Sequence, residues 1–147
     1  MRISTRGRYA LRAMVDLALH ADEGPVARCD IAKRQGISAD YVAQLFRRLR
    51  AAGLVEGVRG PGGGYTLARD ATTICAGDVV RAVEGPIGVA GCVAPGGDLT
   101  CQRVEECVTR AVWQQVSQAV EKVLDKIMLA ELRDEAQALA MQGGEVG

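Results

Sequence analysis

Three cysteines, Cys92, Cys101 and Cys107, lie within sixteen residues of one another in the second half of the chain. A Pro-Gly-Gly turn separates the first two, and the surrounding sequence lacks the apolar pattern of a helix or strand. Thiolate is the ligand that iron–sulfur centres and zinc prefer, and thiols in one flexible loop can converge on such a centre. The spacing therefore predicts a metal or cluster site. Reduced surface thiols, or one disulfide with a spare thiol, are the alternative interpretation.

A helix-turn-helix pattern precedes this loop. Residues 30–35 form a short predicted helix that ends at Gly36, and Ser38 is suited to cap a second helix over residues 39–52. Two short helices joined by a turn with glycine are typical of DNA-binding proteins. The second helix would present its first turn to base edges and its later arginines to phosphates. The residues predicted to face a groove are Asp40, Ala43, Gln44 and Arg47.

A glycine-rich hairpin follows directly. Two β-prone runs, 54–58 and 65–67, flank the sequence Gly-Pro-Gly-Gly-Gly. The tip has no side chains to obstruct close approach, and Arg59 stands at its base. A hairpin in this position is a wing, and its bare backbone with an arginine suits entry into a minor groove. Arg59, Gly60 and Gly62 are therefore further candidate DNA contacts.

The remaining elements are predicted to be helical. A first helix begins after Ser4 and runs to about residue 21, and another spans about 75–84. Cys29 and Cys75 are interpreted as small buried hydrophobes. From about 107 to 141 no residue breaks the helical pattern, and an apolar stripe runs along it. Such a stripe needs cover, which predicts a dimerisation helix that pairs with a second copy. The stripe comprises Val108, Val112, Val116, Ala119, Val120, Val123, Ile127 and Leu132.

Composition restricts the function classes. Residues 1–70 carry twelve Lys/Arg against seven Asp/Glu, whereas residues 71–147 carry six against eleven. A basic half beside an acidic half predicts a nucleic-acid surface and a separate regulatory surface. The chain shows neither a signal peptide nor a run of about eighteen apolar residues, which predicts a cytoplasmic protein with no membrane partner. No nucleophile–base or acid–base pair indicates an enzyme.

The chain resembles the IscR/NsrR-type winged helix-turn-helix family of iron–sulfur and redox-sensing transcriptional regulators. The resemblance covers nearly the whole chain in order and is carried by Arg-Tyr-Ala-Leu near Tyr9, Gln-Gly-Ile-Ser at 35–38, Gln-Leu-Phe at 44–46, Gly-Leu-Val at 53–55, Val-Arg-Gly-Pro-Gly-Gly-Gly-Tyr at 58–65, the three loop cysteines and Ala-Val-Trp at 111–113. It implies a homodimer on a pseudo-palindromic double-stranded DNA operator. It also implies a cluster, 2Fe–2S or 4Fe–4S, on Cys92, Cys101 and Cys107, and base contacts from Asp40, Ala43, Gln44 and Arg59.

The chain departs from that family at the fourth ligand. IscR-type proteins have a histidine three residues after the last cysteine, where this chain has Arg110. A protonated arginine has no free lone pair with which to ligate iron. NsrR-type proteins use an aspartate of the partner's first helix, where this chain has Arg8. Among nearby carboxylates Glu106 is favoured because it adjoins Cys107. We therefore expect three protein thiolates and a labile fourth position.

The predicted fold class is mainly α with a small β wing. It comprises a winged helix-turn-helix domain (1–85), a cysteine-rich cluster-binding loop (86–107), a long C-terminal dimerisation helix (108–141) and a flexible tail (142–147). The favoured function is a dimeric cluster-sensing regulator, with the iron–sulfur assembly machinery as a further partner. Two alternatives stay open: a DNA-binding repressor controlled by thiol oxidation or a partner, and an iron–sulfur or zinc carrier without specific DNA binding.

Overall fold

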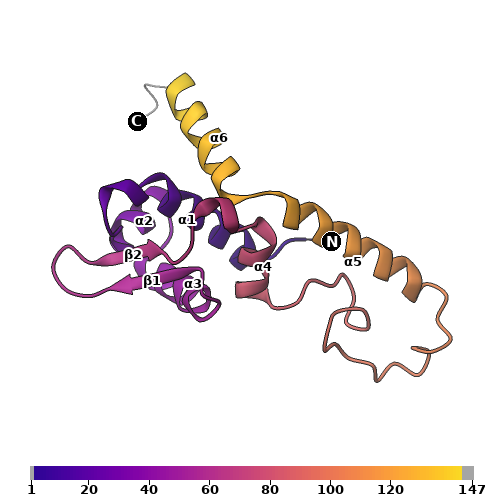
Figure 1. Cartoon of the computed structure of the whole chain (residues 1–147). Helices are drawn as coiled ribbons and strands as arrows, with labels where there is room; N and C mark the ends of the chain where they lie inside the picture. The colour runs from indigo at the N-terminus through magenta and orange to yellow at the C-terminus, as the bar shows by residue number, and fades with distance from the viewer. Residues whose placement is uncertain (1, 144–147) are drawn as a thin grey trace.

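The computed structural model describes residues 2–143 of the chain and is mainly helical with one two-stranded sheet (Figure 1). Helix α1 spans Thr5–Leu19, and Ser4 caps it by accepting a hydrogen bond from the Gly7 amide. After a short 3-10 turn, η1 (Ala21–Glu23), helix α2 spans Arg28–Gln35 and helix α3 spans Ala39–Ala51. The predicted helix-turn-helix is therefore confirmed.

A buried carboxylate holds α2 against α1. Asp16 is 3% exposed and accepts hydrogen bonds from Arg34 Nη2 at 2.8 Å, Arg34 Nε at 2.9 Å and Gln35 Nε2 at 2.9 Å. The hydrogen bond and the charge of Asp16 raise the pKa of Arg34. A buried carboxylate needs such a complete set of donors, because burial without them would be costly. The contact fixes the end of α2 from which the turn to α3 departs.

The wing is an antiparallel hairpin of β1 (Val55–Val58) and β2 (Gly64–Leu67). Val55 pairs with Leu67 and Val58 with Gly64, so the glycine-rich tip projects beyond the paired residues. A second 3-10 turn, η2 (Ala71–Thr73), leads into helix α4, which spans Ala76–Glu84. The predicted strands and helix are confirmed to within a residue or two.

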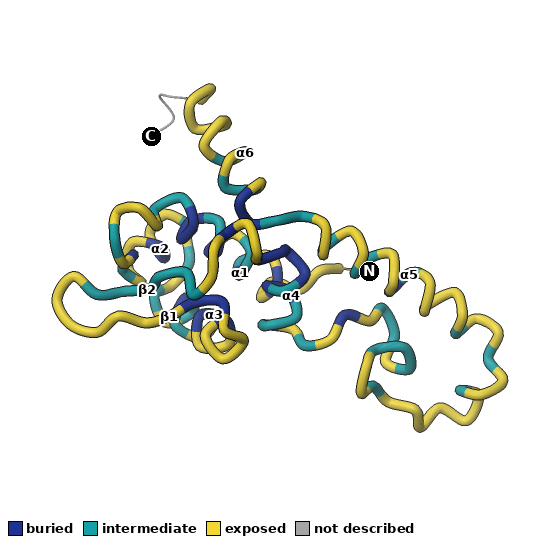
Figure 2. The backbone as a smooth tube through the Cα atoms, in the orientation of Figure 1, coloured by how far each residue is buried: buried dark blue, intermediate teal, exposed yellow. Residues whose placement is uncertain are grey.

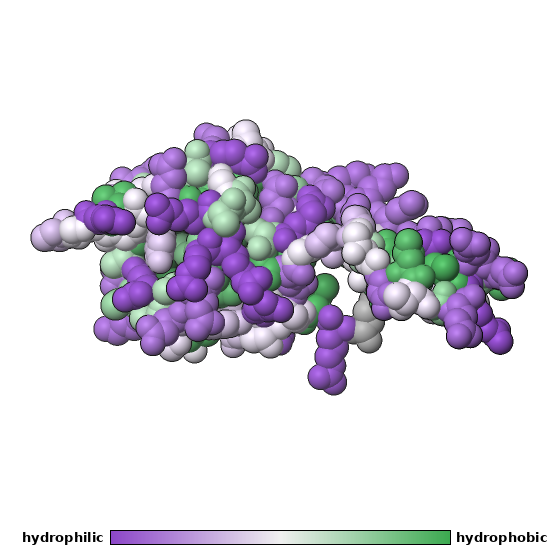
Figure 3. All heavy atoms as spheres, turned by 90° about the horizontal axis from the view of Figure 1, so that it is seen from below, coloured by the Kyte–Doolittle hydropathy of each residue, from purple (hydrophilic) through white to green (hydrophobic). Residues whose placement is uncertain are grey.

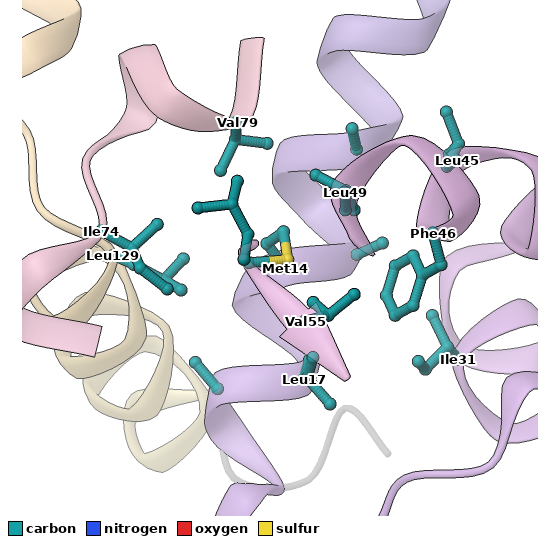
Figure 4. Close-up of a cluster of buried hydrophobic side chains, with 14 of the residues drawn as sticks. Met14, Leu17, Ile31, Leu45, Phe46, Leu49, Val55, Ile74, Val79 and Leu129 are labelled. Atoms are coloured by element: carbon teal, nitrogen blue, oxygen red, sulfur yellow. The ribbon is translucent and has the colours of Figure 1, made fainter. Parts of the chain in front are cut away.

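The core lies between α1, α3, α4, the start of β1 and the start of α6. Figure 4 shows Met14 and Leu17 of α1 beside Val55, and Ile74 beside Leu129. The large side chains that are less than 2% exposed are Phe46, Met14, Leu17, Ile31, Leu45, Leu49, Ile74, Leu129, Val42, Val55, Val79 and Val83. Figure 2 shows this core in the winged-helix body and at the base of α6, whereas α5, the rest of α6 and the cysteine loop are mostly exposed.

The expected continuous helix over 107–141 is wrong. Two helices occupy this region, α5 (Arg110–Lys126) and α6 (Leu129–Gln142), and α6 projects from the body while α5 runs outward to the cysteine loop (Figure 1). Ile127 and Met128 adopt extended conformations because this segment pairs with the chain ahead of α4. Ala76 N–H donates to Ile127 at 2.8 Å and Leu129 N–H donates to Ile74 at 2.8 Å. Of the predicted tail, Gln142 ends α6, and residues 144–147 lie outside the described part.

The two cysteines outside the loop differ from each other. Cys75 is buried, as expected, and it also caps α4, because its Sγ accepts from the Asp78 amide at 3.4 Å while Asp78 accepts from the Cys75 amide. Burial raises the pKa of this thiol. Cys29 is exposed, so its prediction as a buried residue is wrong: it stands in the first turn of α2, ahead of the buried residues Ile31 and Ala32. Within residues 2–143, no helix is long and apolar enough to cross a bilayer.

The anchoring of α6 generates the first prediction. Leu129→Ala should destabilise the fold by about 2–5 kcal/mol, because the side chain is 1% exposed and its removal leaves a cavity beside Ile74. Leu99→Ala makes the same change at a loop side chain that is 58% exposed, and should shift stability by no more than about 0.5 kcal/mol. Urea denaturation of both variants at one protein concentration measures the difference. Equal stabilities would show that α6 does not belong to the core.

Candidate nucleic-acid interface and cysteine loop

Helix α3 turns one face to the core and the other to solvent. Gly36, with φ of 68°, ends α2 in the left-handed conformation, and Ser38 Oγ accepts from the Tyr41 amide at 3.0 Å to start α3. The inner side is buried through Val42, Leu45, Phe46 and Leu49. Asp40, Gln44 and Arg47 are exposed and Ala43 is half-buried, so the four predicted groove residues stand on the outward side.

The wing is locked to α3 at its base. Val26 N–H donates to Tyr65 O at 2.9 Å, and Tyr65 N–H donates to Val26 O at 2.8 Å. The Tyr65 ring meets the Phe46 ring edge to face at 4.4 Å between centroids. A side chain at Gly64 would come within 2.2 Å of the Val26 carbonyl, so only glycine permits this contact. The hairpin is therefore held against both the segment before α2 and the helix expected to enter the groove.

The wing tip is exposed, as predicted for a DNA contact. Arg59, Gly60 and Gly62 are all exposed, and Gly60 and Gly62 have φ of 92° and 75°, which favour glycine. Figure 3 shows hydrophilic side chains across the face that carries α3 and the wing. Arg59 and Arg50 of α3 line one hollow, so the wing lies beside the end of this helix.

Arginines from separate elements line two hollows. One, of about 220 Å³, is lined by Arg28 of α2, Arg50 of α3 and Arg59 of the wing. The other, of about 530 Å³, is lined by Arg6 of α1 with Gln44 and Arg47 of α3. Cationic side chains of this kind can pair with the phosphates of a nucleic-acid backbone. Sequence analysis did not single out Arg28, because only the tertiary fold brings the start of α2 beside the wing.

The cysteine loop carries turns but no helix or strand between Gly85 and Arg110. Cys92 and Cys107 are half-buried, Cys101 and Glu106 are exposed, and all three thiols are free. Cys107 Sγ lies 3.1 Å from Thr109 Oγ1, and this hydrogen bond, with the Arg110 amide, lowers the pKa of the thiol. In the described part of the chain no three His, Cys, Asp or Glu side chains gather closely enough to hold a metal ion. The loop conformation therefore does not bring the predicted ligands together.

The donor set nevertheless fits a thiolate-ligated centre. Three thiols stand on one loop without disulfides, and thiolate sulfur is the ligand of iron–sulfur clusters and a common ligand of zinc. The turns between Ala90 and Glu106 are single hydrogen-bonded turns, such as the Gly97 amide to Ala94 at 2.8 Å and the Val104 amide to Cys101 at 3.1 Å. Rearranging such turns to converge the thiols would break few hydrogen bonds.

The loop and α5 connect directly to the winged-helix body. Ser117, the buried residue of α5, accepts a hydrogen bond from the Val89 amide at 3.0 Å. Near the other end of α5, Asp125 accepts from Arg81 of α4 at 2.6 Å, and Arg81 also lies 3.6 Å from Asp78. Asp78 in turn pairs with Arg69 at 3.2 Å, just after β2. Charged contacts therefore join α5, α4 and the segment that follows the wing.

The apolar residues of α5 are covered to different extents along the helix. Val120 and Leu124 line a hollow with Val80 of α4, so they face the protein's own body. Val112, Trp113 and Val123 are 41–59% exposed. A separate apolar groove of about 620 Å³ runs between α1 and α6, lined by Leu11, Val15, Leu19, Leu132, Ala136 and Leu139 among others. One chain thus presents both an apolar ridge and an apolar groove.

Comparison with known proteins gives consistent matches. A family model described as Rrf2, iron-dependent transcriptional regulator, matches residues 3–135. The HTH-type transcriptional regulator IscR of Klebsiella pneumoniae (strain 342) is 45% identical over 143 residues, which cover 97% of this chain and 86% of the relative. The IscR of Escherichia coli (strain K12 / DH10B) matches with the same identity and coverage.

Two solved structures support the same placement. T. potens IscR is 41% identical with a TM-score of 0.75, covering 92% of this chain and 88% of that one. CymR (YrzC), the global cysteine regulator of B. subtilis, is 39% identical with a TM-score of 0.75, covering 92% of this chain and 98% of that one. The matches to both structures therefore extend over nearly the whole chain, beyond the DNA-binding part alone.

Proposed function

The chain belongs to the Rrf2 family of DNA-binding transcriptional regulators, and from this premise we propose that it is a homodimer whose operator binding is governed by an iron–sulfur cluster on its cysteine loop. It is a regulator and not an enzyme. The observation that carries the proposal is the joint arrangement of an outward α3, an arginine-bearing wing and a three-thiol loop that leads directly into α5.

DNA recognition follows from the chemistry of the exposed side. Gln44 carries an amide that can make paired hydrogen bonds to adenine in a major groove, and Arg47 can reach a phosphate. Arg59 on the wing has the charge and length to enter a narrowed minor groove. Arg6, Arg28 and Arg50 supply further phosphate contacts from the hollows that they line. Asp40 and Ala43 lie in the same two turns of α3 and bear on the choice of base.

Dimerisation would cover the apolar surfaces of the outer helices. The exposed apolar ridge of one α5 consists of Val112, Trp113 and Val123. It has the same apolar character as the α1–α6 groove of a second copy. A C2 dimer would then present two recognition helices to an operator with matching twofold symmetry.

The cysteine loop is proposed to hold the cluster through Cys92, Cys101 and Cys107, with Glu106 as the nearby carboxylate for a fourth position. The family description names iron dependence, and three free thiols on one loop suit iron–sulfur ligation. When bound, the cluster would supply sensitivity to iron, oxidants or cluster supply. The loop would transmit its state through Val89 to Ser117 and through Asp125 to Arg81 of α4.

The DNA-contact prediction concerns Arg59 and Gln44. Arg59→Ala should weaken binding to an operator selected from a random duplex library by about 10–100-fold, since one groove contact is worth roughly 1–3 kcal/mol. Gln44→Ala should instead alter the preferred base at one position in each half-site. Lys122→Ala removes one exposed charge from α5 and should leave both properties unchanged. Fluorescence anisotropy at several salt concentrations measures affinity. Parent affinity and specificity in both test variants would contradict DNA recognition through α3 and the wing.

The dimer prediction concerns the exposed side of α5. Replacing Val112 and Val123 with Glu should convert the dimer to a monomer, because unpaired charges in an apolar interface are costly. The matched control, Gln114→Glu with Gln118→Glu, adds the same charge at exposed polar positions of the same helix. Light scattering after gel filtration gives the molecular mass. A dimer that survives the valine substitutions would place the interface elsewhere.

The cluster prediction uses anaerobically purified protein. Visible absorbance with stoichiometric iron and sulfide is expected in the parent chain and in Cys29→Ala, whose cysteine lies outside the loop. Replacing all three loop cysteines with Ala should abolish the absorbance while the helical circular dichroism persists, because none of the three belongs to the core cluster. Zinc in place of iron and sulfide would identify a zinc site. The absence of any metal would favour control by thiol oxidation.

A further inference from the structure

Arg110, the first residue of α5, holds both arms of the cysteine loop. Its Nη2 and Nε donate to the Cys92 carbonyl at 3.0 and 3.3 Å, and its Nη1 donates to the Val104 carbonyl at 3.4 Å. Its backbone N–H donates to the Cys107 carbonyl at 3.2 Å. One residue thus contacts the main chain at two of the three thiol positions.

The helix position is an unfavourable one for an arginine. The first turn of a helix carries partial positive charge, so a cation there is repelled and an acid is preferred. No acidic residue occupies the first turn of α5, and the side chain of Thr109 makes no capping hydrogen bond. Its hydroxyl lies instead within hydrogen-bond distance of Cys107 Sγ. The local helix sequence therefore does not account for arginine at this position, whereas its loop contacts do.

The shape of the guanidinium suits it to bind two carbonyls of the loop at once. It offers five N–H donors in a rigid plane, so one side chain can hold two carbonyls from separate segments of the loop. The two acceptors are 18 and 6 residues before Arg110 in the chain. Closing loops of these lengths costs conformational entropy, and charge-assisted hydrogen bonds offset part of that cost.

We propose that Arg110 is a positioning residue that joins the Cys92 arm of the loop to the start of α5, beside Cys107, before any metal or cluster binds. Cluster binding by the thiols rests on the proposed function. The contacts of Arg110 with the loop do not depend on it. The loop is therefore closed by contacts at the start of α5. A change in the conformation of the loop would act on the end of α5 that lies farthest from the winged-helix core.

The test measures how closely Cys92 and Cys107 approach in cluster-free protein. In full-length chain with Cys29→Ser and Cys101→Ser, the equilibrium of the Cys92–Cys107 disulfide with a glutathione redox buffer gives the effective concentration of one thiol at the other. Arg110→Ala should lower this value about tenfold, as expected for the loss of hydrogen bonds from a charged donor. Arg110→Lys should lower it as well, because a single ammonium keeps the charge but cannot reproduce the planar fork.

The controls separate the clamp from simpler effects. Arg103→Ala removes an exposed arginine from the same loop and should stay within about twofold of the parent value. The proposal is overturned by parent-like values in both Arg110 variants, by a parent-like value in Arg110→Lys alone, or by an equal fall in Arg103→Ala. Helical circular dichroism verifies that each variant is folded. A chain that binds no cluster yet shows the predicted fall contradicts the proposed function and still supports the clamp.

Discussion

The backbone pairing between Ile74–Ala76 and Ile127–Leu129 determines how the rest of the chain is arranged. Two hydrogen bonds of 2.8 Å interrupt what would otherwise be one long helix and bring Leu129 into the core beside Ile74. Because this point is fixed, α5 must run outward along α4, and α6 must leave the body near α1. The path of α5 in turn determines where the cysteine loop ends. The winged helix and the loop are therefore both positioned relative to one short segment of extended chain.

Local signals made most of the DNA-binding half predictable. Ser4 and Ser38 cap their helices, Gly36 ends α2, and the glycine-rich tip forms a hairpin, as the sequence indicated. Each of these features depends on residues within a few positions of one another. The family resemblance pointed in the same direction, and the comparisons confirmed the family.

The features that sequence analysis missed arise from contacts distant in the chain. Ile127 and Met128 are compatible with a helix, and the break between α5 and α6 exists because they pair with a segment about fifty residues earlier. Arg28 lies beside the wing because the bridge between Val26 and Tyr65 joins the start of α2 to the hairpin. The exposure of Cys29 and the loop contacts of Arg110 likewise depend on packing rather than on local pattern. The turns of the loop do not bring the three thiols together, so their convergence depends on the binding of a metal or cluster.

The attachment of the wing has a consequence for the DNA rather than for the protein. Paired hydrogen bonds join Tyr65 to Val26, the Tyr65 ring packs on Phe46, and Gly64 leaves no room for even one added carbon. In the proposed complex with DNA, the recognition helix and the wing would therefore keep a fixed separation. A duplex would have to match that separation in groove width, or bend until it does. The elastic energy of that bending differs between base sequences, so the stiffness of base pairs that the protein does not touch would contribute to its choice of operator.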